Sequence, residues 1–224
     1  MQTWSKYFHG FLNLFFQSNC FICQRPTPYD FCLDCTRQVQ RCCLSNPNFL
    51  WQPPLPIFAW GMYGGTLKRA IAAMKYENQP DIARPLGYWL GEAWLNSQHS
   101  SKQLVVVPIP LHASKKKERG YNQAALIAQS FCEITGNIYI ANGLERVRST
   151  TAQFGLSMAE REKNLTEAFR VGTDFRRRPN APVLLVDDIY TTGATARSAV
   201  QTLRQSRIAV YGLVAVATTV RGNR

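Results

Sequence analysis

The segment from Val183 to Thr195 constrains the fold more than any other part of the chain. Four apolar residues, Val-Leu-Leu-Val, are followed by Asp187 and Asp188, then by Ile-Tyr and by Thr-Thr-Gly-Ala-Thr. The apolar run predicts a buried strand, and the small residues predict a turn that leads into a helix. Free backbone N–H groups at a helix N-terminus attract anions, and Gly193 allows a ligand to approach the backbone closely. In open α/β sheets such a site lies at the carboxyl ends of the strands.

The chemistry of this segment indicates a receptor for a ribose 5-phosphate. Two carboxylates disfavour a phosphate at their own position, but they can accept hydrogen bonds from sugar hydroxyls or lie near a metal ion. We therefore expect Asp187 and Asp188 to bind a diol. The phosphate is expected in the loop formed by Thr191, Thr192, Gly193, Ala194 and Thr195. The alternative, an acidic strand end followed by a simple helix cap, leaves the Thr-Thr-Gly-Ala-Thr run unexplained.

Apolar strands alternate with helices over most of the chain. Strands are expected at residues 104–107, 138–140, 183–186 and 208–217, and helices at 65–77, 80–98, 120–134, 158–166 and 193–206. This alternation predicts an α/β fold with a parallel sheet covered by helices on both faces. A further short helix is expected at residues 3–17, where an apolar stripe packs on the rest of the protein. Its other possible role, binding to a membrane surface, is disfavoured because its polar face is almost free of Lys and Arg.

Six of the seven cysteines lie within a Cys- and Pro-rich segment near the N-terminus. Two Cys-x-x-Cys pairs supply four thiolates, the set that a structural zinc ion binds in a tetrahedron, and the metal would order a segment with little core of its own. Disulfides are the alternative, and the lack of a secretory signal argues against them. Cys42 and Cys43 are expected to be spare thiols or packing residues, with a second metal site as the less favoured alternative. The predicted zinc ligands are Cys20, Cys23, Cys32 and Cys35.

The charge balance and hydropathy restrict partners and location. The chain has 26 Lys and Arg against 14 Asp and Glu, a formal net charge of +12. This excess favours an anionic partner, which could be a phosphate ester, a nucleic acid or a membrane surface. No apolar run approaches the ~20 residues of a membrane span, and the N-terminus lacks the features of a secretory signal. We therefore expect a soluble, cytoplasmic protein without a membrane span.

The Val183–Thr195 segment resembles the 5-phosphoribosyl-1-pyrophosphate (PRPP) signature of type I phosphoribosyltransferases. With the four-cysteine knuckle before it, the chain resembles the ComF/GntX family along essentially its whole length. The further matching motifs are Leu12-x-Leu14-Phe15, Tyr63-Gly64-Gly65-x-Leu67-Lys68-x-x-Ile71-x-x-x-Lys75-Tyr76, Pro108-Ile109-Pro110-Leu111-His112, Arg119-Gly120-Tyr121-Asn122-Gln123, Arg146-x-Arg148-x-Thr150-Thr151-x-Gln153, Arg161-x-x-Asn164 and Ala168-Phe169. Because the Cys- and Pro-rich texture ends near residue 58, we expect an N-terminal helix and zinc-binding domain at residues 1–57. A phosphoribosyltransferase-like domain is expected at residues 58–224.

The resemblance implies that PRPP binds with Mg²⁺ and that a nucleophile displaces pyrophosphate at the anomeric carbon. Asp187 and Asp188 would then hold the ribose hydroxyls, and residues 191–195 would hold the 5-phosphate. The polar run at 114–121 suits a mobile lid whose cations neutralise the leaving pyrophosphate, and Arg119 is its expected catalytic residue. Residues 115–117 are individually more typical of solvated loop charge. Further expected contacts are Arg146, Arg148 and Gln153, whereas His112 is either a ligand contact or a capped loop residue.

The same resemblance links the chain to DNA uptake and transformation, which leaves other functions open. One alternative is a module that binds single-stranded DNA or a nucleotide without turnover, with aromatic rings stacking on bases. Most of the rings available for stacking are more typical of a core: Phe31, Trp51, Trp60, Tyr63 and Tyr121. Another alternative is a scaffold whose knuckle docks a helicase of the DNA-import machinery. The intact acidic pair and loop favour retained ligand binding, while the acceptor of a transfer reaction is not predicted.

Overall fold

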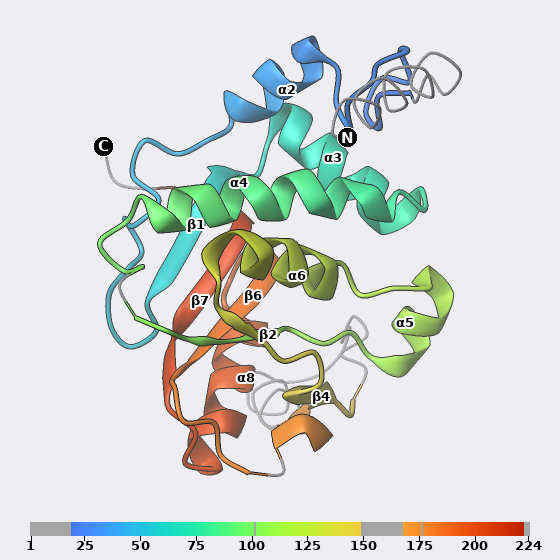
Figure 1. Ribbon diagram of the computed structural model, residues 1–224. Helices are drawn as coiled ribbons and strands as arrows, with labels where there is room; N and C mark the ends of the chain where they lie inside the picture. The colour runs from blue at the N-terminus through green and yellow to red at the C-terminus, as the bar shows by residue number, and fades with distance from the viewer. Residues whose placement is uncertain (1–18, 101, 149–167, 176, 222–224) are drawn as a thin grey trace, which may run out of the picture.

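The computed structural model describes residues 19–100, 102–148, 168–175 and 177–221 (Figure 1). The helices expected at 3–17 and 158–166, and Gln153, lie outside these residues. The centre of the described part is a five-stranded sheet in the order β1-β7-β6-β2-β3, in which every neighbouring pair is parallel. This confirms the predicted α/β architecture. The strands are β1 (Ile57–Met62), β2 (Val105–Pro108), β3 (Ile138–Tyr139), β6 (Val183–Tyr190) and β7 (Val210–Thr218).

Helices cover both faces of the sheet. They are α3 (Gly65–Tyr76), α4 (Ala83–Leu95), α6 (Gln123–Thr135) and α8 (Ala194–Gln205), with the short 3-10 helix η1 (Pro80–Ile82) before α4. Figure 1 shows α4 and α6 on one side of the sheet and α8 on the other. Side chains alternate along β6, so Leu184 and Val186 join the core beneath α3, α4 and α6, whereas Val183 and Leu185 join the core beneath α8. No helix in the described parts of the chain is long and apolar enough to cross a bilayer.

A helix, α5 (Ala113–Arg119), replaces the polar loop that the sequence predicts after β2. Its Ala, Lys, Glu and Arg residues have high helix propensity, which outweighs the loop-like look of a charged run. The ring of His112 accepts a hydrogen bond from the N–H of Ser114 at 3.3 Å, and Gly120 ends the helix in the left-handed conformation with φ of 83°. No residue of α5 is buried. The helix therefore lies outside the core, as a movable lid would.

Several strands differ from the sequence-based expectation. β6 runs four residues beyond the expected end at Val186, because Asp187 to Tyr190 remain paired with β7. β1, which contains Phe, Trp and Gly and follows a Pro-rich linker, is not predicted. An antiparallel pair, β4 (Leu144–Arg146) and β5 (Phe169–Val171), is followed by a 3-10 helix, η2 (Thr173–Phe175). Three residues are too few to show the periodicity by which a strand is recognised.

The cysteine-rich segment packs directly on the domain that contains the sheet. Its one helix in the described residues, α2 (Leu33–Gln40), begins within the second Cys-x-x-Cys pair, with Cys32 at its N-cap and Cys35 in its first turn. Cys20, Phe31 and Val39 are buried in the same apolar cluster as Phe58 of β1 and Leu67 of α3. The two parts of the chain therefore share one core.

Candidate functional site

The carboxyl ends of β2 and β6 meet where the order of the sheet reverses. From β6 the chain crosses through α8 to β7, and from β2 it crosses through α6 to β3 on the opposite side. Ligands of open α/β sheets bind in the crevice outside such a point. β2 accompanies β6 as far as Val186, after which β6 continues beside β7. Asp187 and Asp188 therefore lie just beyond the point where β2 leaves β6.

Asp187 and Asp188 are neighbours in a strand, so their side chains point to opposite faces of the sheet. Asp187 is in register with Ala215, whose side chain belongs to the α8 face. Asp188 points to the α3 face, where its Oδ2 lies 2.7 Å from the Nζ of Lys75. The side chains of Lys75 and Asp188 are 17% and 5% exposed. This ion pair is thus shielded from solvent, most completely on the side of the acid.

The environment of Asp187 disfavours its negative charge. Burial, followed by the neighbouring charge of Asp188, raises the pKa of Asp187 well above its ordinary value. The backbone N–H of Asp188 donates to Asp187 Oδ1 at 2.9 Å and acts in the opposite direction. On the same face, burial lowers the pKa of Arg146 in β4, and the charge of Asp187 opposes that shift. A hydrogen-bond donor brought by a ligand would stabilise the charged form of Asp187.

The loop between β6 and α8 has a backbone that requires glycine. Gly193 precedes α8 with φ of 75°, a left-handed conformation that side chains disfavour. A Cβ at this position would lie 2.6 Å from the Oη of Tyr190. Arg197 of α8 donates from Nη1 to the carbonyl oxygen of Thr192 at 2.8 Å and so braces the loop. Thr191 and Thr192 are exposed, so a ligand can reach the loop from solvent.

Arg119 is held in a fixed orientation at the end of α5. Its Nη1 donates to the Oε1 of Gln123, a buried residue at the start of α6. Its guanidinium also lies over the ring of Tyr76, at 5.8 Å from the ring centroid. Arg119 is thus positioned by α6 and by the last residue of α3, although α5 itself has no buried residue.

The residues between Arg119 and Gln123 tie the surrounding elements together. The hydroxyl of Tyr121 donates to the carbonyl oxygen of Met74 in α3. The Nδ2 of Asn122 donates to the carbonyl oxygen of Ile109, just after β2, at 3.0 Å, and its Oδ1 caps α6. The Arg-Gly-Tyr-Asn-Gln motif therefore joins α3, β2, α5 and α6 around one point at the end of the sheet.

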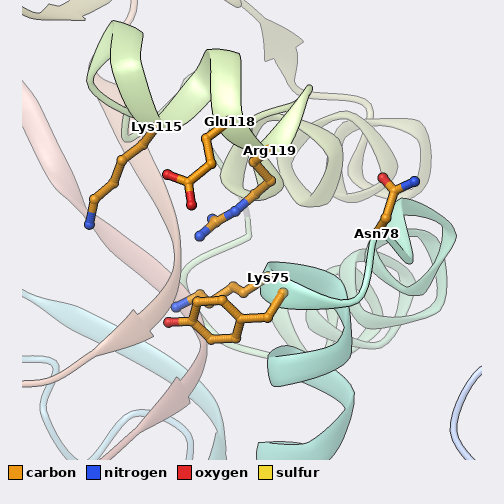
Figure 2. Close-up of a pocket in the computed structure, with 6 residues that line it drawn as sticks. Lys75, Asn78, Lys115, Glu118 and Arg119 are labelled. Atoms are coloured by element: carbon orange, nitrogen blue, oxygen red, sulfur yellow. The ribbon is translucent and has the colours of Figure 1, made fainter.

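A cavity of about 300 Å³ lies between α3 and α5. Figure 2 shows Lys115, Glu118 and Arg119 extending from α5 toward Lys75 on α3. Three cations against one carboxylate make this cavity attractive to an anion. Lys75 belongs both to the cavity and to the ion pair with Asp188. The lining residues are Lys75, Tyr76, Asn78, Lys115, Glu118 and Arg119.

The structure also places several other residues for which the sequence predicted a role. His112 is the N-cap of α5, with its Nδ1 2.7 Å from the Oγ of Ser114. Phe31 and Trp60 are buried in the core and cannot stack on a base as they stand. Lys115 lines the cavity, and Arg148 is exposed beyond β4.

Lys75 belongs to one of the matching sequence motifs, but the sequence did not predict its role in this site. It follows Ile71 by four residues and Leu67 by eight, so it lies on the buried face of α3. A cation on the buried face of a helix needs a buried partner, so the position of Lys75 within the helix could have indicated an ion pair. The partner could not be named in advance because Asp188 lies far along the chain.

The four expected metal ligands form a compact group. The Sγ atoms of Cys20, Cys23, Cys32 and Cys35 lie within 4.8 Å of one another, and those of Cys23 and Cys32 are 3.6 Å apart. In a tetrahedral zinc site with Zn–S bonds of about 2.3 Å, the sulfurs are about 3.8 Å apart. None of the seven cysteines, all within the described residues, forms a disulfide. The group therefore fits a metal ion such as zinc.

The electrostatics of the group favour thiolate at Cys23 and oppose it at Cys35. The backbone N–H of Arg25 lowers the pKa of Cys23 to about 6, with burial acting against it and the neighbouring thiols assisting it. Burial raises the pKa of Cys35. Cys42 lies outside the group, with its Sγ 3.6 Å from the carbonyl oxygen of Gly64, and Cys43 is exposed. Neither belongs to a second cluster of metal ligands within the described residues.

The fold and the cysteine group together define an α/β protein with a parallel five-stranded sheet and an N-terminal four-cysteine segment. No protein-family model matches the sequence. The sequence is 30% identical over 207 residues to competence protein F of Haemophilus influenzae, covering 87% of this chain and 89% of that protein. The chain belongs to the competence protein F (ComF) family.

Further comparisons include a more distant relative and a solved structure. The sequence is 26% identical over 206 residues to DNA utilization protein YhgH of Salmonella typhimurium, covering 82% of this chain and 89% of that protein. Adenine phosphoribosyltransferase from Leishmania donovani is similar in structure, with a TM-score of 0.43 and 12% identity. That match covers 78% of this chain and 73% of the other.

Proposed function

We propose that this chain binds PRPP, or a closely related ribose 5-phosphate, and transfers the phosphoribosyl group to an acceptor with release of pyrophosphate. The observation that supports the proposal is the grouping of three features at the ends of β2 and β6. These are the glycine-dependent loop at 191–195, the acidic pair, and the cationic cavity, which Lys75 lines while it contacts the acidic pair. A loop for one phosphate, acids for a diol and cations for a diphosphate correspond to the three parts of PRPP.

Each group has a role within this proposal. Asp187 and Asp188 accept hydrogen bonds from the ribose hydroxyls, and Arg119 neutralises the negative charge that develops on the leaving diphosphate. The bond between the anomeric carbon and the diphosphate oxygen breaks with its electron pair on pyrophosphate, and the nucleophile bonds to the same carbon. The 5-phosphate is held by backbone N–H groups and hydroxyls of Thr191, Thr192, Gly193, Ala194 and Thr195.

Mg²⁺ is proposed to bind with the ligand. This ion is commonly held by substrate phosphates and one or two carboxylates, and when bound it would neutralise diphosphate charge. Asp187 at the end of the sheet and Glu118 in the cavity are the carboxylates of this chain that could join it. Asp188 is less suited, because its Oδ2 contacts Lys75.

We further propose that the four-cysteine group binds one structural zinc ion. The zinc-binding domain would comprise residues 1–57, and the phosphoribosyltransferase-like domain residues 58–224. The metal would fix the geometry of the segment around α2. A cytoplasmic location is consistent with reduced thiols.

The names of the relatives suggest a role in competence or DNA utilization, which we propose for this chain too. The second candidate activity is binding of single-stranded DNA without turnover. The observation that favours it is Tyr76, which is 78% exposed beside Arg119 and could stack on a base. A helicase of the DNA-import machinery is the protein partner proposed for the zinc-binding domain.

An assay of pyrophosphate release tests the enzymatic proposal. Purified protein is incubated with PRPP and Mg²⁺ and with a panel of nucleobases and other nitrogen nucleophiles. Acceptor-dependent release that is lost in Arg119→Gln supports transfer. PRPP binding without release for any acceptor, combined with DNA binding at low salt, where electrostatic affinity is greatest, would favour the second candidate.

A further inference from the structure

We propose that Lys75 is a positioning residue that changes its partner when the ligand binds, from the carboxylate of Asp188 to an anionic group in the cavity. This inference rests on the proposed function and adds a residue and a coupling to it. The ammonium of Lys75 would thereby link the diol-binding acid to the diphosphate-binding cavity.

The position of Lys75 between two environments is the first support. Its Nζ lies 2.7 Å from Oδ2 of Asp188, which is almost fully buried, while the same side chain lines the cavity of about 300 Å³. An ammonium group has three N–H donors, so contact with one carboxylate oxygen leaves capacity for another acceptor. Lys75 lies in the last turn of α3, and its flexible stem allows the ammonium to move while the helix stays in place.

Competition at Asp188 is the second support. Oδ2 of Asp188 already contacts the ammonium of Lys75, so a ribose hydroxyl placed at Asp188 by the proposed function would compete with Lys75 for this buried carboxylate. A hydroxyl is a weaker partner for a buried carboxylate than an ammonium, so it would not displace Lys75 by itself. A diphosphate in the cavity offers Lys75 a second acceptor of high charge, beside Lys115 and Arg119. Filling the cavity would therefore release Asp188 for the diol.

The coupling predicts ligand discrimination. PRPP carries both the diol and the diphosphate, whereas ribose 5-phosphate lacks the group that would attract Lys75. Ribose 5-phosphate would have to bind while Asp188 remains paired. A residue with a purely structural role would affect both ligands to the same extent, whereas an exchanging cation affects their ratio.

The test measures dissociation constants of ribose 5-phosphate and PRPP by calorimetry, both with Mg²⁺, for the full chain and three variants. Lys75→Gln removes the cation, Lys75→Arg retains it, and Lys68→Gln is the matched control on an exposed position of the same helix. The dissociation constant of ribose 5-phosphate divided by that of PRPP is expected to fall about tenfold in Lys75→Gln, which is a typical size for a coupling between sites. It is expected to stay within about threefold of the wild-type value in Lys75→Arg and Lys68→Gln.

Each outcome has a defined meaning. If the wild type binds PRPP and Lys75→Gln leaves the ratio unchanged, the exchange is wrong and the proposed function stands. If the wild type binds neither ligand, both proposals are wrong. Should Lys75→Gln fail to fold, a crystal structure of the wild type with PRPP decides. Nζ more than 4 Å from Asp188 and in contact with a phosphate oxygen supports the exchange, and an intact ion pair overturns it.

Discussion

The guanidinium of Arg197 in α8 donates from Nη1 to the carbonyl oxygen of Thr192 at 2.8 Å. This contact braces the loop between β6 and α8 and leaves the exposed side of the loop accessible to a ligand. We expect Arg197→Gln to weaken PRPP binding by about fivefold, since a charged donor at an exposed site contributes about 1 kcal/mol. Calorimetry measures the change. Arg204→Gln is the control, because Arg204 lies on the same helix but contacts Pro54; an equal loss in both variants would contradict a local role for Arg197.

Gly193→Ala is expected to damage the same loop more severely. The φ of 75° costs an alanine about 1 kcal/mol, and its Cβ would lie 2.6 Å from Tyr190 Oη and 2.9 Å from Arg197 Nη1. PRPP affinity is expected to fall by at least about tenfold. Gly136→Ala carries the same backbone strain, with φ of 70°, but its Cβ meets nothing within 4 Å. If both variants bind PRPP equally well, close packing at Gly193 does not shape the ligand site.

The acidic pair and its loop could be predicted because their signal is local. A strand, two acids, a turn and a helix occupy consecutive positions, so Val183 to Thr195 reveal both the fold class and the expected ligand. The four cysteines could be predicted for the same reason, because the short spacing within each Cys-x-x-Cys pair brings its sulfurs together. The placement of Asp187 and Asp188 on opposite faces also follows from strand alternation, but only once β6 is known to continue through Asp188.

The rest of the site depends on contacts between distant segments. The pairing of Lys75 with Asp188 and of Tyr121 with Met74 requires the tertiary arrangement of α3 beside the sheet. The helical form of α5 could not be predicted, because a Lys-rich run without an apolar stripe lacks the periodicity of a core-facing helix. Its helical form depends on the caps at His112 and Gly120.

His99 makes stability depend on pH. It is buried and stacked on Trp51 with ring centroids 4.2 Å apart, and burial lowers its pKa from the ordinary value of 6.5. Below that value the unfolded chain binds a proton that the folded protein resists, so the free energy of unfolding falls as the pH falls. The slope contributed by His99 is at most about 1.4 kcal/mol per pH unit.

Chemical denaturation between about pH 5 and pH 8 measures this effect. His99→Phe is expected to flatten the dependence below pH 6.5. A profile unchanged in His99→Phe would show that other groups control the acid side.

Zinc removal is expected to unfold the N-terminal segment. Purified, reduced protein should contain about one zinc ion per chain, because four thiolates complete a structural site. Cys32→Ser should lose the ion and lower the melting temperature, whereas Cys43→Ser, outside the group, should change neither. Metal analysis and thermal unfolding check both. Protein that folds normally with less than about half an equivalent of zinc would contradict the assignment.

Calorimetric titration of the purified chain with PRPP and Mg²⁺ tests the central claim most directly. The account predicts saturable binding in the wild type and a loss of at least about tenfold in both Asp187→Asn and Asp188→Asn, with folding verified by thermal unfolding. Absence of a binding signal at millimolar PRPP, or full affinity in both acid variants, would contradict it.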